Sequence, residues 1–429
     1  MAKFTEWVEE KVAPVAGRLT QQTHLQALTR TFSALMPLIT VGSFALLLST
    51  PAADAALMEQ GFLREAARVW NWVSGAIGPA GRLLYAVTMR PLSIYVSFGL
   101  GYFLSEERER KGLLPALVCA AAFLMTVGIG AGNVLDVDRL GTRGLFAAIV
   151  VSCLAFELWR VLSSSKAGRM DLSAAGVPGA ITEGLSELMP AALTVCAFAV
   201  LSAVIRSLFG TPLSELMERL IAPVAGAVDS LVGVAVLLML VQVLWWFGIH
   251  DSVLTNPLTP FLTANLVANA AAYAEGTSAA LLPHIVTNTF WAMFGIGCLS
   301  LTLAVLCVSS RSKRIREVGR IALVPSIFNI SEPLLFGLPV MYNTTLLIPF
   351  LVIQPLNGVL SYLAMSHGLI NRTVVNFGWS MPALLGQVIS TVDLRGALVY
   401  LAMFVMDILI WLPFFKVYER RSLAEESEE

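Results

Sequence analysis

Two ionisable side chains, His250 and Glu332, stand in stretches of the sequence that otherwise carry no charge. Glu332 is the one formally charged residue between Arg320 and Arg372, and His250 follows the uncharged run 231–249. A carboxylate at membrane depth is costly unless it faces a cavity or a partner. A carboxylate and an imidazole are also a natural pair for handling hydroxyl protons. We therefore predict that both bind substrate and act catalytically in one polar site; a helix-terminal histidine capped by Asp251 is the alternative for His250.

The residues around Glu332 predict a break in the helix that carries it. Pro333, Gly337 and Pro339 follow the acid closely, and they oppose a regular helix. Non-helical backbone inside a membrane persists where protein or a water-filled cavity solvates it. The sequence therefore predicts a re-entrant hairpin that carries Glu332 into a substrate chamber.

Amides and aromatic rings near the apolar second half indicate the kind of ligand. Amides both donate to and accept from hydroxyl groups, and indole faces suit sugar rings. As a group they favour a neutral polyhydroxylated ligand, while hydrogen bonding between helices and interface anchoring are the alternatives. Our candidate substrate-binding residues besides the ionisable pair are Asn288, Asn329, Trp245, Trp379 and Arg90. Snorkelling of Arg90 to the lipid headgroups is the alternative for that residue.

Composition places the chain in a membrane. Of its 429 residues 57% are hydrophobic and 13% are charged, well below the charged fraction of a soluble domain, which is about 25%. The formal net charge of −1 argues against nucleic acid as a partner. The five cysteines lack metal-ligand spacing, and no Gly-rich phosphate loop followed by Lys occurs. We expect neither a metal nor a cofactor.

Apolar runs predict an all-α polytopic fold with about ten transmembrane helices and re-entrant hairpins. Between the runs of the second half, residues 251–284, 321–343 and 371–394 are too polar to span and too apolar for ordinary loops, as in broken segments near a site. Basic clusters at 311–320 and 416–421 should be cytoplasmic. Asp407, inside the last run, is expected to pair with a cation across the bundle.

Three motifs resemble a known family. They are Gly248-Ile249-His250, the hairpin from Ile330 to Pro339, and the ending from Trp411 to Glu419. Together they resemble the enzyme IIC component of the phosphoenolpyruvate-dependent sugar phosphotransferase system, of the lactose/cellobiose/diacetylchitobiose type. The similarity covers nearly the whole chain and is strongest from Trp245 onward.

The resemblance implies a homodimer in the bacterial inner membrane that carries a beta-linked disaccharide. Residues 1–170 would form the dimerisation half, 171–188 an amphipathic linker, 189–415 a substrate-binding half that moves as a rigid body, and 416–429 a cytoplasmic tail. A separate enzyme IIB, phosphorylated on cysteine, would donate phosphate to the sugar's 6-hydroxyl. Glu332 would bind sugar hydroxyls and His250 would lie near the hydroxyl to be phosphorylated, with Asn288, Trp379 and Arg90 at the pocket.

Two positions depart from the family pattern. Ser331 stands where the family usually has Asn, and Asp251 stands where a small residue usually follows the histidine. A carboxylate beside His250 would weaken a general-base role or repel an anionic donor. Two alternatives therefore stay open: a proton-coupled secondary transporter that uses Glu332 and His250 as a relay, and a sensor that binds sugar without moving it.

Overall fold

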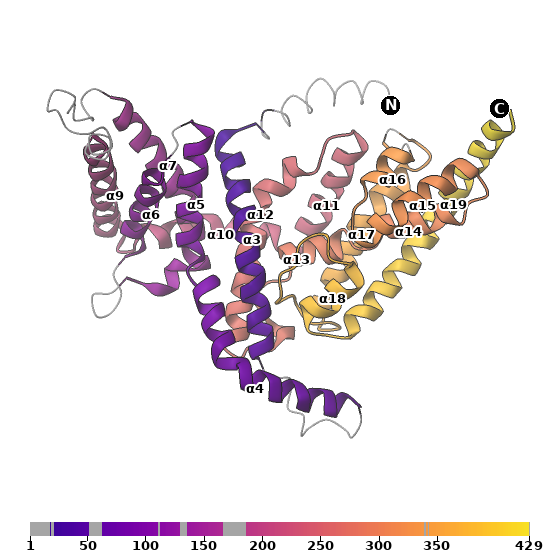
Figure 1. Cartoon of the computed structure of the whole chain (residues 1–429), viewed down its shortest axis with the longest axis horizontal. Coiled ribbons are helices and arrows are strands. Elements are labelled where there is room, and N and C mark those ends of the chain that lie inside the picture. The colour runs from indigo at the N-terminus through magenta and orange to yellow at the C-terminus, as the bar shows by residue number, and fades with distance from the viewer. Residues whose placement is uncertain are drawn as a thin grey trace. The chain divides into compact units, whose positions relative to one another are not determined.

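The computed structural model describes residues 18, 21–50, 62–109, 112–128, 135–165, 186–338, 340, 341 and 343–428. In these ranges the chain is helical and contains no β-strand (Figure 1). The all-α fold predicted from the apolar runs is therefore confirmed. Most of the predicted linker 171–188 lies outside the described residues.

The described residues divide into two compact units. Unit 1 contains those of 43–82 and 225–429, and unit 2 contains those of 21–42 and 83–224. Helices α9 and α10 belong largely to unit 2 although they follow the predicted linker. The predicted functional division into residues 1–170 and 189–415 stays a prediction.

The first seven described helices lie in unit 2 or are divided between the two units. They are α3 (Thr23–Ser49), α4 (Phe62–Thr88), α5 (Leu92–Glu107), α6 (Leu114–Val127), α7 (Leu145–Ser164), α9 (Leu188–Phe209) and α10 (Leu213–Val228). Two short 3₁₀ turns, Val137–Leu140 and Thr142–Gly144, precede α7. Helix α4 is interrupted by neither of its tryptophans nor by Pro79, which lies inside it.

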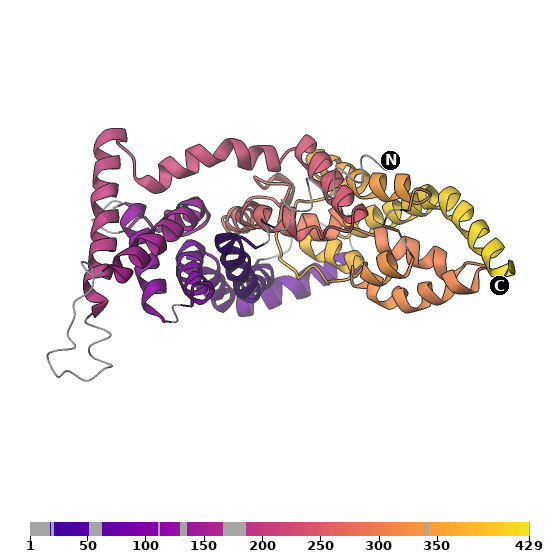
Figure 2. The ribbon, with the colours of Figure 1, turned by 90° about the horizontal axis from the view of Figure 1, so that it is seen from above.

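Unit 1 alternates long helices with short or broken ones. Its helices after α10 are α11 (Leu231–Trp246), α12 (Ser252–Ala274), a 3₁₀ turn (Ala279–Leu281), α13 (Asn288–Phe290), a π-helix (Trp291–Gly295), α14 (Leu299–Val308), α15 (Lys313–Ile327), α16 (Glu332–Gly337), α17 (Leu347–Ser366), α18 (Ala383–Thr391) and α19 (Arg395–Glu428). Figure 2 shows α14 and α15 as neighbours joined by a short turn. The breaks predicted near 284, 330 and 380 are present.

Six described helices are long and apolar enough to cross a membrane, or up to eight spans result if each of two bent helix pairs is counted as one. One bent pair joins residues 68–88 to 92–107, and the other joins α10 to α11 at an angle of 71°. The multi-span architecture is confirmed. The count of about ten stays a prediction.

Two regions are more helical than the sequence predicts. Residues 252–274 form the continuous helix α12 despite Pro257 and Pro260, since proline removes one helical hydrogen bond without ending a helix that neighbours support. Residues from 416 are helical as the last part of α19, and their assignment as a cytoplasmic tail stays a prediction.

Acids at the end of α19 serve the N-terminus of α15. A Glu426 carboxylate oxygen accepts the Arg314 backbone N–H at 3.0 Å, and Glu419 accepts the Arg311 N–H at 2.7 Å. Ser312 caps the same helix by accepting from Ile315 at 3.2 Å. The first backbone N–H groups of a helix lack intrahelical partners and favour negative charge. The acidic end of the chain is thus a helix cap for the basic cluster at 311–320.

The core of unit 1 includes two large apolar clusters built largely from α11, α14, α17 and the broken segments. One joins Trp246 and Phe247 to Leu334, Leu335 and the α14–α19 contact. The other centres on Phe290 and Phe294 beside α11. Both clusters bury the residues that flank the breaks, so packing holds the interrupted backbone in place.

The close contact between α14 and α15 depends on Gly319, and it yields a prediction. A Cβ at this position would lie 2.5 Å from the backbone N of Val308, and backbone atoms cannot move aside as a side chain does. We expect Gly319→Ala to lower the free energy of unfolding by about 1–3 kcal/mol, measured by thermal unfolding in detergent.

Gly75→Ala is the matched control. No heavy atom lies within 4 Å of the Cβ position at Gly75, which is also helical. The control is expected to stabilise the protein by roughly 0.5–1 kcal/mol, because alanine loses less backbone entropy than glycine. Equal stability changes in the two variants would contradict the proposed close contact.

Candidate functional site

Four non-helical segments of unit 1 carry most of the predicted site. They are residues 247–251, between α11 and α12; 275–287, between α12 and α13; 328–346, around α16; and 370–382, before α18. Each exposes backbone polar groups that a helix would satisfy internally. These backbone groups therefore need hydrogen-bond partners from side chains or from other segments.

His250 lies at the end of a turn that Gly248 makes possible. Gly248 has a φ of +72°, a conformation that L side chains rarely adopt. The His250 ring centroid lies 4.8 Å from that of Trp245, and the side chain is 61% exposed. One face of the imidazole is thus covered by the indole of Trp245, while much of the ring stays accessible to a ligand.

Two neighbours compete for the same nitrogen of His250. Nδ1 lies 3.1 Å from the Oδ1 of Asp251, and the Ser252 backbone N–H donates to Nδ1 at 3.1 Å. A protonated Nδ1 donates to Asp251 and leaves Nε2 free to accept a proton. An unprotonated Nδ1 accepts from Ser252 and places the proton on Nε2. The turn therefore supports both tautomers.

The hairpin around Glu332 packs against the His250 turn. Leu334, Leu335 and Leu338 share one buried cluster with Trp246 and Phe247. This packing anchors the short helix α16, which begins at Glu332 with Pro333 in its first turn, a position that needs no proline N–H. The predicted break in the helix is confirmed, with a six-residue helix inside it.

Glu332 itself is half-buried at the start of α16. Among the described residues, no side chain or backbone N–H forms a hydrogen bond or ion pair with its carboxylate. Its charge is felt by Asp251: burial raises the pKa of the Asp251 carboxyl, His250 lowers it, and Glu332 raises it further, with a net upward shift. His250, Asp251 and Glu332 therefore form one electrostatic cluster.

Asn329 joins the hairpin to the last broken segment. Its Nδ2 donates to the backbone oxygens of Trp379 and Met381, each at 2.9 Å. Asn329 holds a φ of +61°, a left-handed conformation that Asn tolerates better than most residues. The Trp379 side chain is 54% exposed. Asn329 therefore fixes the backbone of the loop that carries Trp379, and the Trp379 ring is left partly exposed.

Asn288 joins the second segment to the fourth. Its Nδ2 donates to the Oδ1 of Asn376 at 2.8 Å. The Thr287 and Thr373 hydroxyls are 2.7 Å apart. The Asn376 backbone N–H in turn donates to the Ser43 hydroxyl at 3.0 Å. These side chains replace the backbone ladder that two adjacent extended segments would otherwise form.

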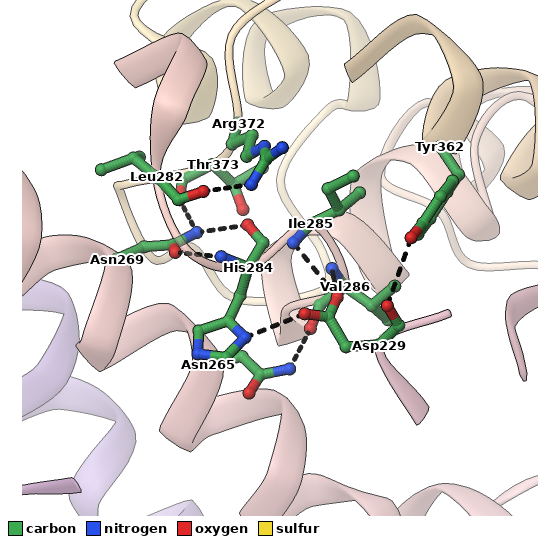
Figure 3. Close-up of polar contacts among 10 residues, drawn as sticks. All are labelled: Asp229, Asn265, Asn269, Leu282, His284, Ile285, Val286, Tyr362, Arg372 and Thr373. Atoms are coloured by element: carbon green, nitrogen blue, oxygen red, sulfur yellow. Dashed lines mark hydrogen bonds and ion pairs between the residues drawn. The ribbon is translucent and has the colours of Figure 1, made fainter. Parts of the chain in front are cut away.

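An aspartate outside the predicted set anchors this second segment (Figure 3). The Oδ1 of Asp229 accepts the backbone N–H groups of Ile285 and Val286 at 3.1 and 2.7 Å, and its Oδ2 lies 2.8 Å from Nδ1 of His284. Asn269 bonds both the N–H and the carbonyl of His284, at 2.9 and 2.8 Å. The bend leading to Asn288 is thus held by side chains on each side.

The structure connects all but one of the predicted residues through unit 1. Trp245, His250 and Glu332 belong to the turn and hairpin that pack together, and Asn329 links that hairpin to the Trp379 loop. Asn288 reaches the same loop through Asn376. Arg90 is exposed and belongs to unit 2, so its predicted contribution stays a prediction.

Several amides that suggested a polyhydroxylated ligand bond to the protein instead. Asn265 donates to the Val286 carbonyl, and Asn343 accepts two backbone N–H groups of its own turn. Sequence reasoning missed Asn376, Asp229 and His284. The signal for Asp229 was available: it directly precedes Ser230, whose hydroxyl caps the apolar helix α11.

Comparisons with known proteins agree with this arrangement. Residues 29–353 match the family described as Phosphotransferase system, EIIC. The chain is 27% identical to the oligo-beta-mannoside-specific EIIC component of Bacillus subtilis (strain 168), over 99% of this chain and 96% of the relative. It is 26% identical to the cellobiose-specific EIIC component of Geobacillus stearothermophilus, over 99% and 96%.

A solved structure has the same fold. The crystal structure of the transporter ChbC, the IIC component from the N,N'-diacetylchitobiose-specific phosphotransferase system, superposes with a TM-score of 0.84. The two chains are 25% identical, and the match covers 99% of this chain and 100% of that one. The chain belongs to the EIIC family of the phosphotransferase system, and it is therefore a multi-pass membrane protein of the bacterial cell membrane that acts on sugar.

Proposed function

We propose that this chain is the permease for a beta-linked disaccharide of the cellobiose, diacetylchitobiose or lactose class. It would carry the sugar by a rigid-body, elevator-like motion and present the 6-hydroxyl to a separate, phosphorylated enzyme IIB. The observation that carries the proposal is that contacts join the four broken segments in one unit, and that one segment carries a carboxylate with no hydrogen-bond partner among the described residues. The names of the similar proteins, which include an oligo-beta-mannoside, a cellobiose and an N,N'-diacetylchitobiose component, support the substrate class.

Glu332 would bind the sugar hydroxyls. Its carboxylate is half-buried, and the described part of the chain offers it no hydrogen-bond donor. Hydroxyl groups of a sugar would supply donors, and bonds to a charged acceptor are stronger than neutral ones. Trp379, exposed on a loop that Asn329 clamps, would stack on an apolar sugar face.

His250 would act on the hydroxyl to be phosphorylated. The 6-hydroxyl oxygen would attack the phosphorus held on the IIB cysteine, so the O–P bond forms, the P–S bond breaks, and the hydroxyl proton passes to Nε2 of His250. Asp251, 3.1 Å from Nδ1, would stabilise the imidazolium that results. The protein otherwise supplies position and charge, which dominate phosphoryl transfer. The reactive cysteine would belong to IIB, so this chain contributes part of an enzyme.

A homodimer would hold one part of each chain fixed while the part carrying the four segments moves. The many side-chain bonds within unit 1 support rigid-body motion, because they fix the broken segments to one another.

Reconstituted vesicles test the function directly. Proteoliposomes that contain the full chain and enclose phosphorylated IIB should convert external disaccharide to internal disaccharide phosphate. Omitting IIB, or supplying unphosphorylated IIB, should abolish accumulation. Chemical identification of the internal sugar is the measurement.

A different product would identify a different function. Unmodified internal sugar whose accumulation follows a proton gradient would identify the proton-coupled transporter. Sugar binding without any flux would identify a sensor. Either result would refute group translocation by this chain.

Glu332→Gln is expected to weaken disaccharide binding roughly 10- to 100-fold, because it removes the charge from the hydrogen bonds to the sugar. Isothermal titration of the purified protein measures the dissociation constant. Glu317→Gln is the matched control, since Glu317 is exposed on α15 and pairs with Arg320. Equal affinities of wild type and both variants would remove Glu332 from the site.

His250→Gln is expected to leave disaccharide affinity nearly unchanged and to slow phosphorylation by about 10²- to 10⁴-fold, the usual contribution of general acid–base catalysis. Single-turnover transfer from phosphorylated IIB to bound sugar gives the rate. His367→Gln, at an exposed helix end, serves as the control. A His250 variant with normal transfer would show that the imidazole takes no part in the proton transfer.

A further inference from the structure

Asp407 lies completely inside unit 1, and it has no part in the proposed transfer. It belongs to α19 and is 0% exposed. Its Oδ2 accepts from Nδ2 of Asn357 at 3.0 Å, on α17, and from the thiol of Cys298 at 3.1 Å, at the start of α14. The expected cation is not there: among the described residues no basic side chain pairs with Asp407.

Two oxygens at this contact have no donor. They are Oδ1 of Asp407 and Oδ1 of Asn357, both buried, and neither has a hydrogen-bond partner among the described residues. Asn357 is also 0% exposed. Buried polar atoms are nearly always satisfied, so two orphan acceptors on one facing pair need an explanation. Each residue already bonds the other through its second polar atom, which places a carboxyl group against an amide group.

The distribution of donors distinguishes the two carboxyl oxygens. Both donors, the amide N–H and the thiol, reach Oδ2, whereas none reaches Oδ1. This asymmetry is what a carboxylic acid requires, with Oδ2 as the carbonyl oxygen and Oδ1 as the hydroxyl. An ionised carboxylate would instead have two equivalent oxygens, both in need of donors.

Neither a bare charge nor a metal ion fits the contact as well. An ionised side chain inside a membrane domain is strongly disfavoured without a partner. Hard cations take about six or more oxygen ligands, whereas this contact presents two unpartnered oxygens. Among the described residues no group of three or more His, Cys, Asp or Glu side chains could hold a metal. A proton on Oδ1 of Asp407 would turn one of these unpaired acceptors into a donor.

We propose that Asp407 and Asn357 form a proton-binding site within the membrane domain. The proton resides on Oδ1 of Asp407 and is donated to Oδ1 of Asn357, while Asn357 donates through Nδ2 to Oδ2 of Asp407. The result is a cyclic, neutral acid–amide pair joined by two hydrogen bonds, in which both oxygens of Asp407 and both polar atoms of Asn357 take part.

The pair joins α14, α17 and α19. A second contact, between Ser361 and Met403, shows how α17 and α19 run. Ser361 lies one turn after Asn357, whereas Met403 lies one turn before Asp407, so the two helices are antiparallel here. Cys298 follows the π-helix that continues from Asn288, and Gly297 brings the backbone close to Asn357. The neutral pair thus fixes the segment that carries Asn288, and its proton is structural, not transported.

Infrared spectroscopy of the full chain in detergent tests the proposal. The infrared difference spectrum, wild type minus Asp407→Asn, should show the carbonyl band of a neutral carboxylic acid, because the variant lacks that acid. Asp393→Asn is the matched control, because Asp393 forms an ion pair with Arg395 at 2.8 Å and should lose carboxylate bands instead. Loss of carboxylate bands in Asp407→Asn would overturn the proposal.

Stability provides a second, independent measurement. An amide at position 407 can donate and accept as the acid does, so Asp407→Asn should keep the wild-type melting temperature and transport. Asp407→Leu should lower the melting temperature by several degrees, since Asn357 then has no partner. Equal destabilisation by Asn and Leu would overturn the neutral pair.

The exchange variant Asp407→Asn/Asn357→Asp keeps the test decisive if the single variant folds poorly. It places the acid on α17 and the amide on α19, and it should restore both folding and the neutral-acid band. Failure of the exchange variant to fold would overturn the proposal. A melting temperature that rises with sodium in wild type but not in Asp407→Asn would show a cation in place of the proton, and would overturn it as well.

Discussion

The need to satisfy backbone polar groups where helices are interrupted governs unit 1. A transmembrane helix bonds its own N–H and C=O groups, but a broken one must find other partners. Here short polar side chains supply them: Asp229 accepts two backbone N–H groups, and Asn329 donates to two carbonyls. Asn269 donates to the His284 carbonyl and accepts the His284 backbone N–H. The broken segments are therefore a cross-linked scaffold and not flexible loops.

This scaffold determines which polar groups are left for a ligand. Asn265, Asn269 and Asn343 are occupied by backbone atoms, so amide content alone is a poor guide to the sugar site. Glu332 and Trp379 are different, because their backbones are fixed while their side chains are left accessible. A rigid frame with free functional groups is the arrangement that positions a substrate at low entropic cost.

Sequence reasoning succeeded where a residue conflicts with its surroundings. The prolines beside Glu332 predicted a break in the helix, and the break is present; the substrate site predicted from Glu332 in an apolar run stays a prediction. It failed where long-range contacts decide the outcome. Pro257 and Pro260 suggested a broken segment, yet packing keeps α12 continuous. The bond between Asn288 and Asn376 joins residues 88 positions apart, and no local pattern reveals such a pairing.

The charge around His250 bears on the direction of the proposed reaction. Glu332 is close enough to Asp251 to disfavour ionisation of the Asp251 carboxyl, and His250 is the basic group beside it. A neutral disaccharide would meet donors and acceptors there without electrostatic cost. Its phosphorylated product would bring added negative charge against two carboxyl groups, and like charges repel more strongly in a partly buried site than in water. The acid proposed to bind the sugar would therefore help to expel the sugar phosphate, so release would need no ion gradient.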